Sequence, residues 1–591
     1  MIDFYFEIPL PVDPNLITRI IQSVGNYSNG SLFSDQVNII LPKEHDVFKK
    51  NNALYIILGD LIIPSKYNNK NTYYEDIFSR FNQDSLKELK GHFYIIEFNS
   101  NQNNINVYNS LFSIYPIYYI QKASTIYISS KIHLIKTHSN QIFEFNKRFI
   151  LENVLFNYPI FDTTYLKEVF LLKSNSYLSI KDAFKIIKHT HIENYFVYNP
   201  VSWKKSRENI ANCFIEQAVD YFPSQEFNIA LTGGFDGRTL TSCALKEGKK
   251  EFINAFCFGN SESLDVKYSK QMAEIAGLNY NIYSLTEQYI KNESLKNGLE
   301  FIQNSEGHAS FARAHYLYSA KFLSKKSKFL ISGNFGSDVL RGFNVAGVMA
   351  SPLLVTLFNN FDIDFIKNQF ESSYEMSFLN KANFTAEKES LFEDIKTNPL
   401  FKDDYKNLTQ NQIFYIFVFE EIFRKYFGPE MVNQAAYLYN RTPFLDFTFI
   451  KELLKTKLAG ANQEFFVKNP IKRFRGQGLY PKILKKSYPD FSKIKTDNGY
   501  RPIDLINTVG LFNILIGYAK KKIKKIDKSI DPFAVKESYI YNKEYFRNIP
   551  IDENIFNKTK IEEQFDNPNR KETLFISLSQ NWWKKQFNNP K

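Results

Sequence analysis

The chain has little cysteine and no long hydrophobic run. Its three cysteines, Cys213, Cys243 and Cys257, lie at spacings that fit neither a zinc site nor a disulfide framework. The N-terminus lacks the basic start and the apolar run of a signal peptide. The longest weakly polar stretch, residues 505–519, is too short to cross a bilayer. From these scarcities we expect a reduced, cytoplasmic protein.

The positive charge is unevenly distributed. The net charge is +12, and the run KKKIKKIDK at residues 520–528 carries a large part of it. Because the surplus is so uneven, we expect no nucleic-acid partner. Residues 505–528 could form an amphipathic helix resting on a membrane surface or an acidic partner, or a packed C-terminal helix with a solvated basic end. The sequence leaves both interpretations open.

Length and composition indicate several folded domains. The 591 residues exceed what one core accommodates, and 44% hydrophobic and 16% aromatic residues are ample for large cores. Up to about residue 195, short β-type runs alternate with Asn- and Ser-rich turns, which predicts an antiparallel domain. From about residue 205, helical patterns alternate with short apolar runs, which predicts a parallel sheet with helices on both faces. Beyond about residue 350 the pattern is helical.

These patterns place the elements as follows. The expected strands are 37–41, 53–58, 92–98, 105–108, 114–120, 125–129, 227–231, 253–258 and 329–332. The expected helices include 206–221, 264–276, 312–323, 413–427 and 447–458.

The most informative segment is residues 229–239, Ile-Ala-Leu-Thr-Gly-Gly-Phe-Asp-Gly-Arg-Thr. It predicts a buried strand, a tight glycine turn and the N-terminus of a helix. Backbone N–H groups and the helix dipole converge on an anion in such a turn. No Gly-Lys-Ser/Thr follows, so it is not a Walker loop, and the glycine spacing is not that of a Rossmann fingerprint.

Further motifs follow in order. The strand at 253–258 ends at Phe258, and the strand at 329–332 leads into a second glycine-rich turn with Gly333, Gly336 and Asp338. The C-terminal edge of a doubly wound sheet is where such a fold places its ligand. Later segments are Asn440–Asp446, Lys495–Tyr500, and Leu574–Leu578 followed by Trp582 and Trp583.

The first loop resembles the pyrophosphate loop Ser-Gly-Gly-x-Asp-Ser of the ATP pyrophosphatase superfamily. Taken in order, the segments resemble the asparagine synthetase family. Gly91-His92-Phe93 and Tyr115-Pro116-Ile117-Tyr118-Tyr119 are similar to motifs of that family's glutaminase domain. The resemblance covers roughly residues 1–505 and the terminal helix.

The resemblance implies three parts. Residues 1–195 would form an α+β, Ntn-hydrolase-like sandwich related to class II glutamine amidotransferases. Residues 205–505 would form an α/β, doubly wound parallel-sheet domain of the ATP pyrophosphatase, adenine nucleotide α-hydrolase-like type. Residues 506–591 would be a helical extension packed on the synthetase domain.

The resemblance also implies a site for ATP and Mg²⁺. Asp236 and Asp338 would be the metal ligands, and Lys495, Asp338 and Glu306 would be catalytic. Lys495 is displaced by two residues from the family's Lys-x-Gly pattern, so Lys472 or Arg501 are alternatives. Arg238 stands where the family has Ser, and could pair with a phosphate or bind a substrate carboxylate. The expected nucleotide-binding residues are Leu231, Thr232, Gly233, Gly234, Asp236, Gly237, Arg238, Phe258, Gly333 and Gly336.

Two departures from the family pattern matter. The residue exposed after removal of Met1 is Ile2 instead of the nucleophilic Cys, so we expect no glutaminase activity. The inactive N-terminal domains of β-lactam synthetase and the lasso-peptide cyclases are similar in this respect. In the second turn, alignment without gaps puts Asn334 on the family's catalytic Glu and Ser337 on its metal Asp, whereas a shift by one residue puts Asp338 on that Asp. Both registers remain open.

Some candidates have simpler explanations. Glu306 and His308 could face the nucleotide cleft or cap the helix that begins near Phe311. His315 is interpreted as a polar packing residue of that helix, and Asp446 as a structural helix cap after Pro443.

The functional hypothesis is an ATP-dependent carbon–nitrogen ligase without glutaminase activity. It would adenylate a small-molecule or peptide carboxylate, releasing pyrophosphate, and join it to an amine, as in natural-product or peptide modification and peptide cyclisation. Alternatives are an ammonia-dependent asparagine synthetase-like enzyme and a catalytically degenerate binding or assembly protein. A tRNA-modifying ATP pyrophosphatase is a weaker alternative. Both substrates and the oligomeric state remain open.

Overall fold

The computed structural model describes residues 2–22, 31–34, 37–402, 404–507, 510, 512–514, 516–517, 533–566 and 571–588. The basic run at 520–528, and with it most of the expected helix at 505–528, lies outside these residues. Within them, every helix is too short or too polar to cross a membrane.

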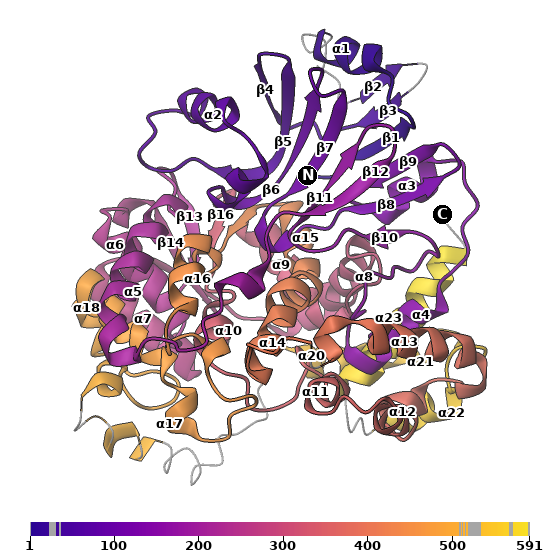
Figure 1. The fold of residues 1–591 in the computed structure, drawn as a ribbon. Coiled ribbons are helices and arrows are strands. Elements are labelled where there is room, and N and C mark those ends of the chain that lie inside the picture. The colour runs from indigo at the N-terminus through magenta and orange to yellow at the C-terminus, as the bar shows by residue number, and fades with distance from the viewer. Residues whose placement is uncertain are drawn as a thin grey trace.

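The N-terminal part contains two six-stranded antiparallel sheets (Figure 1). The first has the order β10-β8-β9-β1-β3-β2 and the second the order β12-β11-β7-β6-β5-β4. The strands of the first sheet are β1 Tyr5–Pro9, β2 Ser31–Ser34, β3 Val37–Ile40, β8 Tyr118–Lys122, β9 Thr125–Ser129 and β10 Phe170–Leu171. Those of the second are β4 Asp46–Lys50, β5 Ala53–Ile62, β6 Lys90–Asn99, β7 Asn104–Asn109, β11 Ser176–Ile180 and β12 Phe184–Lys188.

The two sheets pack face to face through alternate residues of their strands. Successive side chains of a strand point to opposite faces, so β6 serves two cores. Tyr94 packs against Phe4, which directly precedes β1 of the first sheet, with ring centroids 5.0 Å apart. Phe93 and Ile95 point the other way, into a separate cluster that α2, Lys70–Ser79, covers with Tyr73 and Phe78. The antiparallel prediction for this part is therefore confirmed.

The second part is built on a five-stranded sheet in which all strands are parallel. Its order is β15-β14-β13-β16-β17, with β13 Phe227–Ala230, β14 Ile253–Phe258, β15 Asn279–Tyr283, β16 Phe329–Ile331 and β17 Tyr439–Arg441. The chain winds outward from β13 to β15 and then returns to β16 on the other side. The strand order therefore reverses between β13 and β16, which is where sheets of this kind bind ligands.

Helices make up most of the remaining chain. They are α1 Pro14–Gln22, α3 Ile132–His138, α4 Lys147–Phe156, α5 Trp203–Ala218, α6 Asp236–Lys246, α7 Leu264–Ala276, α8 Ser294–Asn304, α9 Ala314–Leu323, α10 Gly336–Leu340, α11 Pro352–Asn359, α12 Ile363–Glu371, α13 Thr385–Thr397, α14 Gln410–Phe417, α15 Gly428–Ala435, α16 Phe447–Leu454, α17 Pro470–Arg473, α18 Tyr480–Ser487, α20 Val535–Tyr541, α21 Lys543–Arg547, α22 Lys558–Gln564 and α23 Lys571–Asn588. A π-helix, Val418–Phe427, continues α14.

One expected strand begins later than the sequence pattern indicates. Residues 114–120 were expected to be extended, but β8 starts at Tyr118. The chain before it turns through a short 3₁₀ segment, Leu111–Ser113, where Phe112 has a φ of 64°. The Phe112 amide donates to the Asn175 side chain at 2.8 Å, a long-range contact that a local pattern does not reveal.

Buried ion pairs join the two parts. The Arg441 guanidinium binds Asp60 through two hydrogen bonds of 2.7 and 3.0 Å. Lys90 lies 3.1 Å from Asp446, whose other carboxylate oxygen accepts from the Phe449 amide at 3.0 Å. Asp446 is thus the predicted cap, at the start of α16.

The C-terminal helix contacts both parts of the molecule. Trp583 of α23 packs edge-on against Tyr165 at 5.2 Å between ring centroids, and Phe587 packs against Phe145 at 5.4 Å. The same helix holds Phe311 of the second part through the Ser579 hydroxyl, which accepts from the Phe311 amide at 3.1 Å. We expected this extension to pack on the synthetase domain. Helix α23 does contact the second part, and it also packs against aromatic side chains of the N-terminal part.

Candidate active site

The two glycine-rich turns meet at the point where the strand order reverses. The first follows β13 and begins α6, and the second follows β16 and begins α10. They approach so closely that a Cβ atom on Gly333 would lie 2.5 Å from the Cβ of Asp236, and one on Gly336 would lie 2.3 Å from its Oδ1. Glycine is therefore required at both positions, because any side chain would separate the turns.

Two carboxylates lie at this contact. Asp236 accepts hydrogen bonds from the Ser337 hydroxyl at 3.1 Å and from the Tyr480 hydroxyl. Burial raises the pKa of Asp236. Burial, and secondarily the charge of Asp236, raises the pKa of Asp338 to about 7. Two acids that resist ionisation together are suited to share a cation.

The donor set fits a hard divalent cation. Carboxylate oxygens are the ligands that Mg²⁺ prefers, and it usually keeps waters or binds substrate phosphates as well. No group of three or more His, Cys, Asp or Glu side chains with metal-binding geometry occurs in the described part of the chain. Asp236 and Asp338 would therefore supply two protein ligands, and oxygen atoms of a phosphate ligand or water the others.

Hydrogen bonds within the protein shape the first turn. The Gly233 amide donates to Asp265 Oδ1 at 3.0 Å, and the Gly234 amide donates to the Thr232 hydroxyl at 3.2 Å. These two N–H groups, which we expected to hold an anion, are bonded to protein side chains, one on α7 and one in the turn itself. The donors suited to an anion are instead those at the start of α6, since the first N–H groups of a helix have no intrahelical partner.

Arg238 does not face this contact. Its side chain is completely buried, and its guanidinium donates to the carbonyl oxygens of Phe491, Ile494, Lys495 and Gly233 at 3.0, 2.6, 2.8 and 3.1 Å. Burial lowers the pKa of Arg238 to about 10. The expectation that Arg238 binds a phosphate or a carboxylate is therefore corrected: it ties the first turn to the segment before Thr496. That segment lies more than 250 residues away in the sequence.

The expected cations are not brought to the carboxylates either. The Lys495 side chain is exposed, and only its carbonyl oxygen reaches the buried Arg238. Lys472 pairs with Glu464, and Arg501 pairs with Asp504 at 2.9 Å.

Glu306 belongs to the junction with the N-terminal part. Its carboxylate accepts from the amides of Ile132 and His133 at 2.8 and 2.7 Å, and from the His133 ring at 3.0 Å. Only 2% of it is exposed. It therefore caps α3, and neither expectation, the nucleotide cleft or the helix near Phe311, is met. The orphan N–H groups at the start of a helix attract a carboxylate, here from a distant segment.

The remaining predicted residues border the first turn. Leu231 is fully buried, and its amide donates to the Phe256 carbonyl at 2.8 Å, so its side chain serves the core. Phe258, half-buried at the end of β14, packs near Tyr283 with ring centroids 5.8 Å apart. Gly237 is required because a Cβ atom there would lie 1.9 Å from the Ala230 carbonyl.

Sequence reasoning missed a buried polar cluster beside the second turn. Glu430 on α15 pairs with Arg313 at 3.0 Å and accepts from the Asn334 side chain at 3.3 Å. Burial raises the pKa of Glu430, although Arg313 opposes this rise. Asn334, which alignment without gaps would put on the catalytic Glu of the resembled family, thus points to a carboxylate on another helix. No local signal in the sequence joins these three residues.

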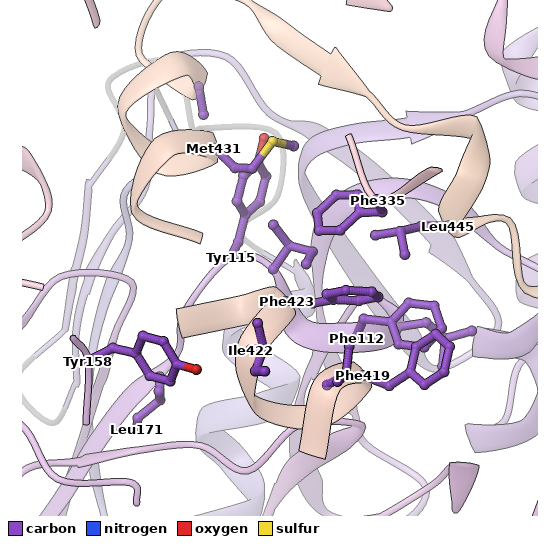
Figure 2. Close-up of a cluster of buried hydrophobic side chains, with 14 of the residues drawn as sticks. Phe112, Tyr115, Tyr158, Leu171, Phe335, Phe419, Ile422, Phe423, Met431 and Leu445 are labelled. Carbon is purple, nitrogen blue, oxygen red and sulfur yellow. The ribbon is translucent and has the colours of Figure 1, made fainter. Parts of the chain in front are cut away.

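An aromatic cluster anchors the second turn (Figure 2). Phe335 has a φ of 70°, which is strained for a residue with a side chain. Its ring packs against Phe423 and Phe427 at 4.8 and 4.6 Å between centroids. Phe112 of the N-terminal part joins the same cluster through Phe419. Burial of Phe335 offsets the strain and couples the turn to the other part of the molecule.

Comparisons with known proteins give only distant structural similarities. No protein-family model and no curated protein matches the sequence. One similar solved structure, the allosteric regulatory enzyme of purine biosynthesis, has 8% identity and a TM-score of 0.21, over 47% of this chain and 64% of that one. Another, glutamine phosphoribosylpyrophosphate amidotransferase from B. subtilis complexed with ADP and GMP, has 8% identity and a TM-score of 0.20, over 63% and 89%. Similarity this low carries no argument about function.

Proposed function

We propose that the protein is an ATP-dependent amide-bond-forming synthetase that releases AMP and pyrophosphate. One observation carries the proposal: the two glycine-rich turns that bear Asp236 and Asp338 meet where the order of a parallel sheet reverses, and the charge of Asp236 acts on Asp338. The first turn lacks the lysine of a Walker loop, so its chemistry would differ from transfer of the terminal phosphate.

The proposed reaction has two steps. A substrate carboxylate oxygen attacks the α-phosphorus of ATP, and the bond to the β-phosphate oxygen breaks, which releases pyrophosphate. An amine then attacks the acyl carbon, loses a proton and displaces AMP. Bound at Asp236 and Asp338, Mg²⁺ would neutralise phosphate charge. The N–H groups that begin α6 would hold phosphate oxygens, and Phe258 lies at the strand end where the resemblance implies adenine.

The amine would come from a substrate or from free ammonia. Ile2 is 3% exposed and contributes to the core of the first sheet, and it has no group that attacks glutamine. The N-terminal part would then be a scaffold, which fits its extensive contact with the second part. Peptide or natural-product modification is the setting that we propose.

The test is a reaction of the full chain with Mg²⁺, ATP and panels of carboxylates and amines. Nucleotide products are separated by chromatography and pyrophosphate is measured independently. We expect AMP and pyrophosphate in equal amounts, and loss of both in Asp236→Asn. The matched control is Asp490→Asn, which removes an exposed carboxylate paired with Lys493 at 2.8 Å. Substrate-dependent release of ADP and phosphate would refute the proposal. Tight binding of ATP without turnover of any pair would favour the binding or assembly alternative.

A further inference from the structure

We infer that a cavity between the N-terminal part, the second part and the C-terminal helix binds a small aromatic carboxylate, at a site separate from the proposed reaction site. The cavity has a volume of about 1000 Å³. Small-molecule sites reach this size, and they combine apolar walls with a few polar groups. Residues of α3, α8, α15 and α23, and those directly before β1, line it. The inference does not depend on the proposed function.

Two ammonium groups in the cavity wall have no carboxylate partner. Lys131 is only 8% exposed, and its ammonium group donates to the Asn304 carbonyl oxygen. The Lys136 ammonium group donates to the Phe587 carbonyl oxygen at 3.2 Å, and burial lowers the pKa of Lys136. Within the described part of the chain, neither lysine forms an ion pair. Each ammonium group has three N–H donors, and a buried charge without a counter-ion is costly, so both lysines favour an anion.

The charges around the cavity leave one positive charge uncompensated. His133 pairs with the buried Glu306 at 3.0 Å. Although burial opposes it, the hydrogen bond and the charge of Glu306 raise the pKa of His133, so this pair is neutral as a unit. Asp3 is the one carboxylate among the described residues that line the cavity. Lys131 and Lys136 against Asp3 leave a charge of one, which matches a monocarboxylate.

Aromatic side chains form the wall opposite in character to these charges. Trp582 and Trp583 of α23 line the cavity together with Tyr165 and Phe587. The Tyr165 ring lies edge-on to those of Trp583 and Phe587, at 5.2 and 6.0 Å between centroids. The Lys136 ammonium group lies 3.7 Å from the centre of the Phe587 ring, so charge and aromatic surface are adjacent. A ligand with a ring beside a carboxylate can therefore contact both at once.

Helix α15 lies between the cavity and the second glycine-rich turn. Val432 and Ala436, four residues apart, line the cavity. Glu430 instead accepts from the side chain of Asn334, beside that turn, at 3.3 Å. Residues two apart on a helix differ by about 200° in direction, so Glu430 and Val432 face opposite sides of α15. The cavity is therefore a second site, with walls that the turn contact does not share.

The test is calorimetric titration of the full chain with indole-3-acetate, acetate and tryptamine. Indole-3-acetate carries the ring and the carboxylate, acetate lacks the ring, and tryptamine has an ammonium group in place of the carboxylate. We expect a Kd on the order of 100 μM for indole-3-acetate. The other two should bind at least about 10-fold more weakly, since each loses one of the two kinds of contact.

Variants of the cavity wall separate the two contacts. Lys136→Glu should weaken indole-3-acetate binding at least about 10-fold and make tryptamine the tighter ligand of the two, because the net charge changes sign. Trp582→Leu should weaken indole-3-acetate about 10-fold by removing aromatic surface. The matched control is Lys585→Gln, which removes an exposed charge from α23 and should match the parent. Thermal unfolding checks that each variant is folded, and Lys136→Gln replaces Lys136→Glu if the latter is not.

The outcomes distinguish this inference from the proposed function. A parent that binds none of the probes, or that binds indole-3-acetate and tryptamine equally, would overturn the inference, as would parent-like binding of indole-3-acetate by the Lys136 variant. Saturating ATP with Mg²⁺ should change the Kd of indole-3-acetate by less than about twofold, and direct competition would show that the sites are not separate. A parent that binds indole-3-acetate but turns over no ATP would refute the proposed function alone.

Discussion

Replacing Arg238 with methionine tests whether this residue is structural, as its contacts show, or binds a ligand, as the sequence suggests. The substitution keeps much of the volume and leaves four carbonyl oxygens without their donor. A hydrogen bond from a charged donor contributes about 1.5–3 kcal/mol. The variant also avoids the cost of burying a charge, which offsets part of the stability lost with these hydrogen bonds. We therefore expect a net loss of about 3 kcal/mol in the free energy of unfolding of this part.

Calorimetric unfolding measures this loss. A change of that size lowers the Tm of a domain of about 200 residues by roughly 6–12 °C. The matched control is Lys495→Ala, in the same segment but with an exposed side chain, which should shift unfolding by less than about 0.5 kcal/mol. A parent-like Tm for Arg238→Met, combined with lost pyrophosphate binding, would contradict the structural role and restore the ligand-binding interpretation.

Two further predictions follow from buried groups. Burial lowers the pKa of His92 to about 4 from 6.5, and its ring lies 2.9 Å from the Thr442 hydroxyl. The imidazole of His92 binds a proton at a higher pH in the unfolded chain than in the folded one. The free energy of unfolding should therefore fall by up to about 3 kcal/mol as the pH drops from 6.5 to 4. Denaturant titrations of His92→Gln at several pH values should not show this loss. If the free energy of unfolding of the variant still falls with pH as in the parent, other groups cause the loss. Incubation with glutamine should release no glutamate, since Ile2 is buried and has no nucleophile; release at the rate of amide formation would refute this.

The local sequence predicted the bounds of those elements that are determined by interactions between neighbouring residues. The strand Ile253–Phe258 and the helix Leu264–Ala276 have the predicted bounds. The helix carries its own signals: the Ser263 hydroxyl accepts from the Val266 amide, and Gly277 ends it with a φ of 61°. The strands β15 and β17 were missed because they are the edges of the sheet. Asn279–Tyr283 is partly polar, and Tyr439–Arg441 is only three residues long, so neither shows the apolar run of a central strand.

The sequence by itself determined that two glycine-rich turns with Asp236 and Asp338 follow strands of a parallel sheet. Parallel strands end at one edge, so their turns must gather there. Which other side chains reach that edge was decided only by tertiary structure. Arg238 turns inward to a segment more than 250 residues away, the Lys495 side chain is exposed, and Glu306 caps a helix of the N-terminal part. The physical reason is that a charged side chain goes where distant backbone groups and charges satisfy it, and spacing along the chain does not encode those partners.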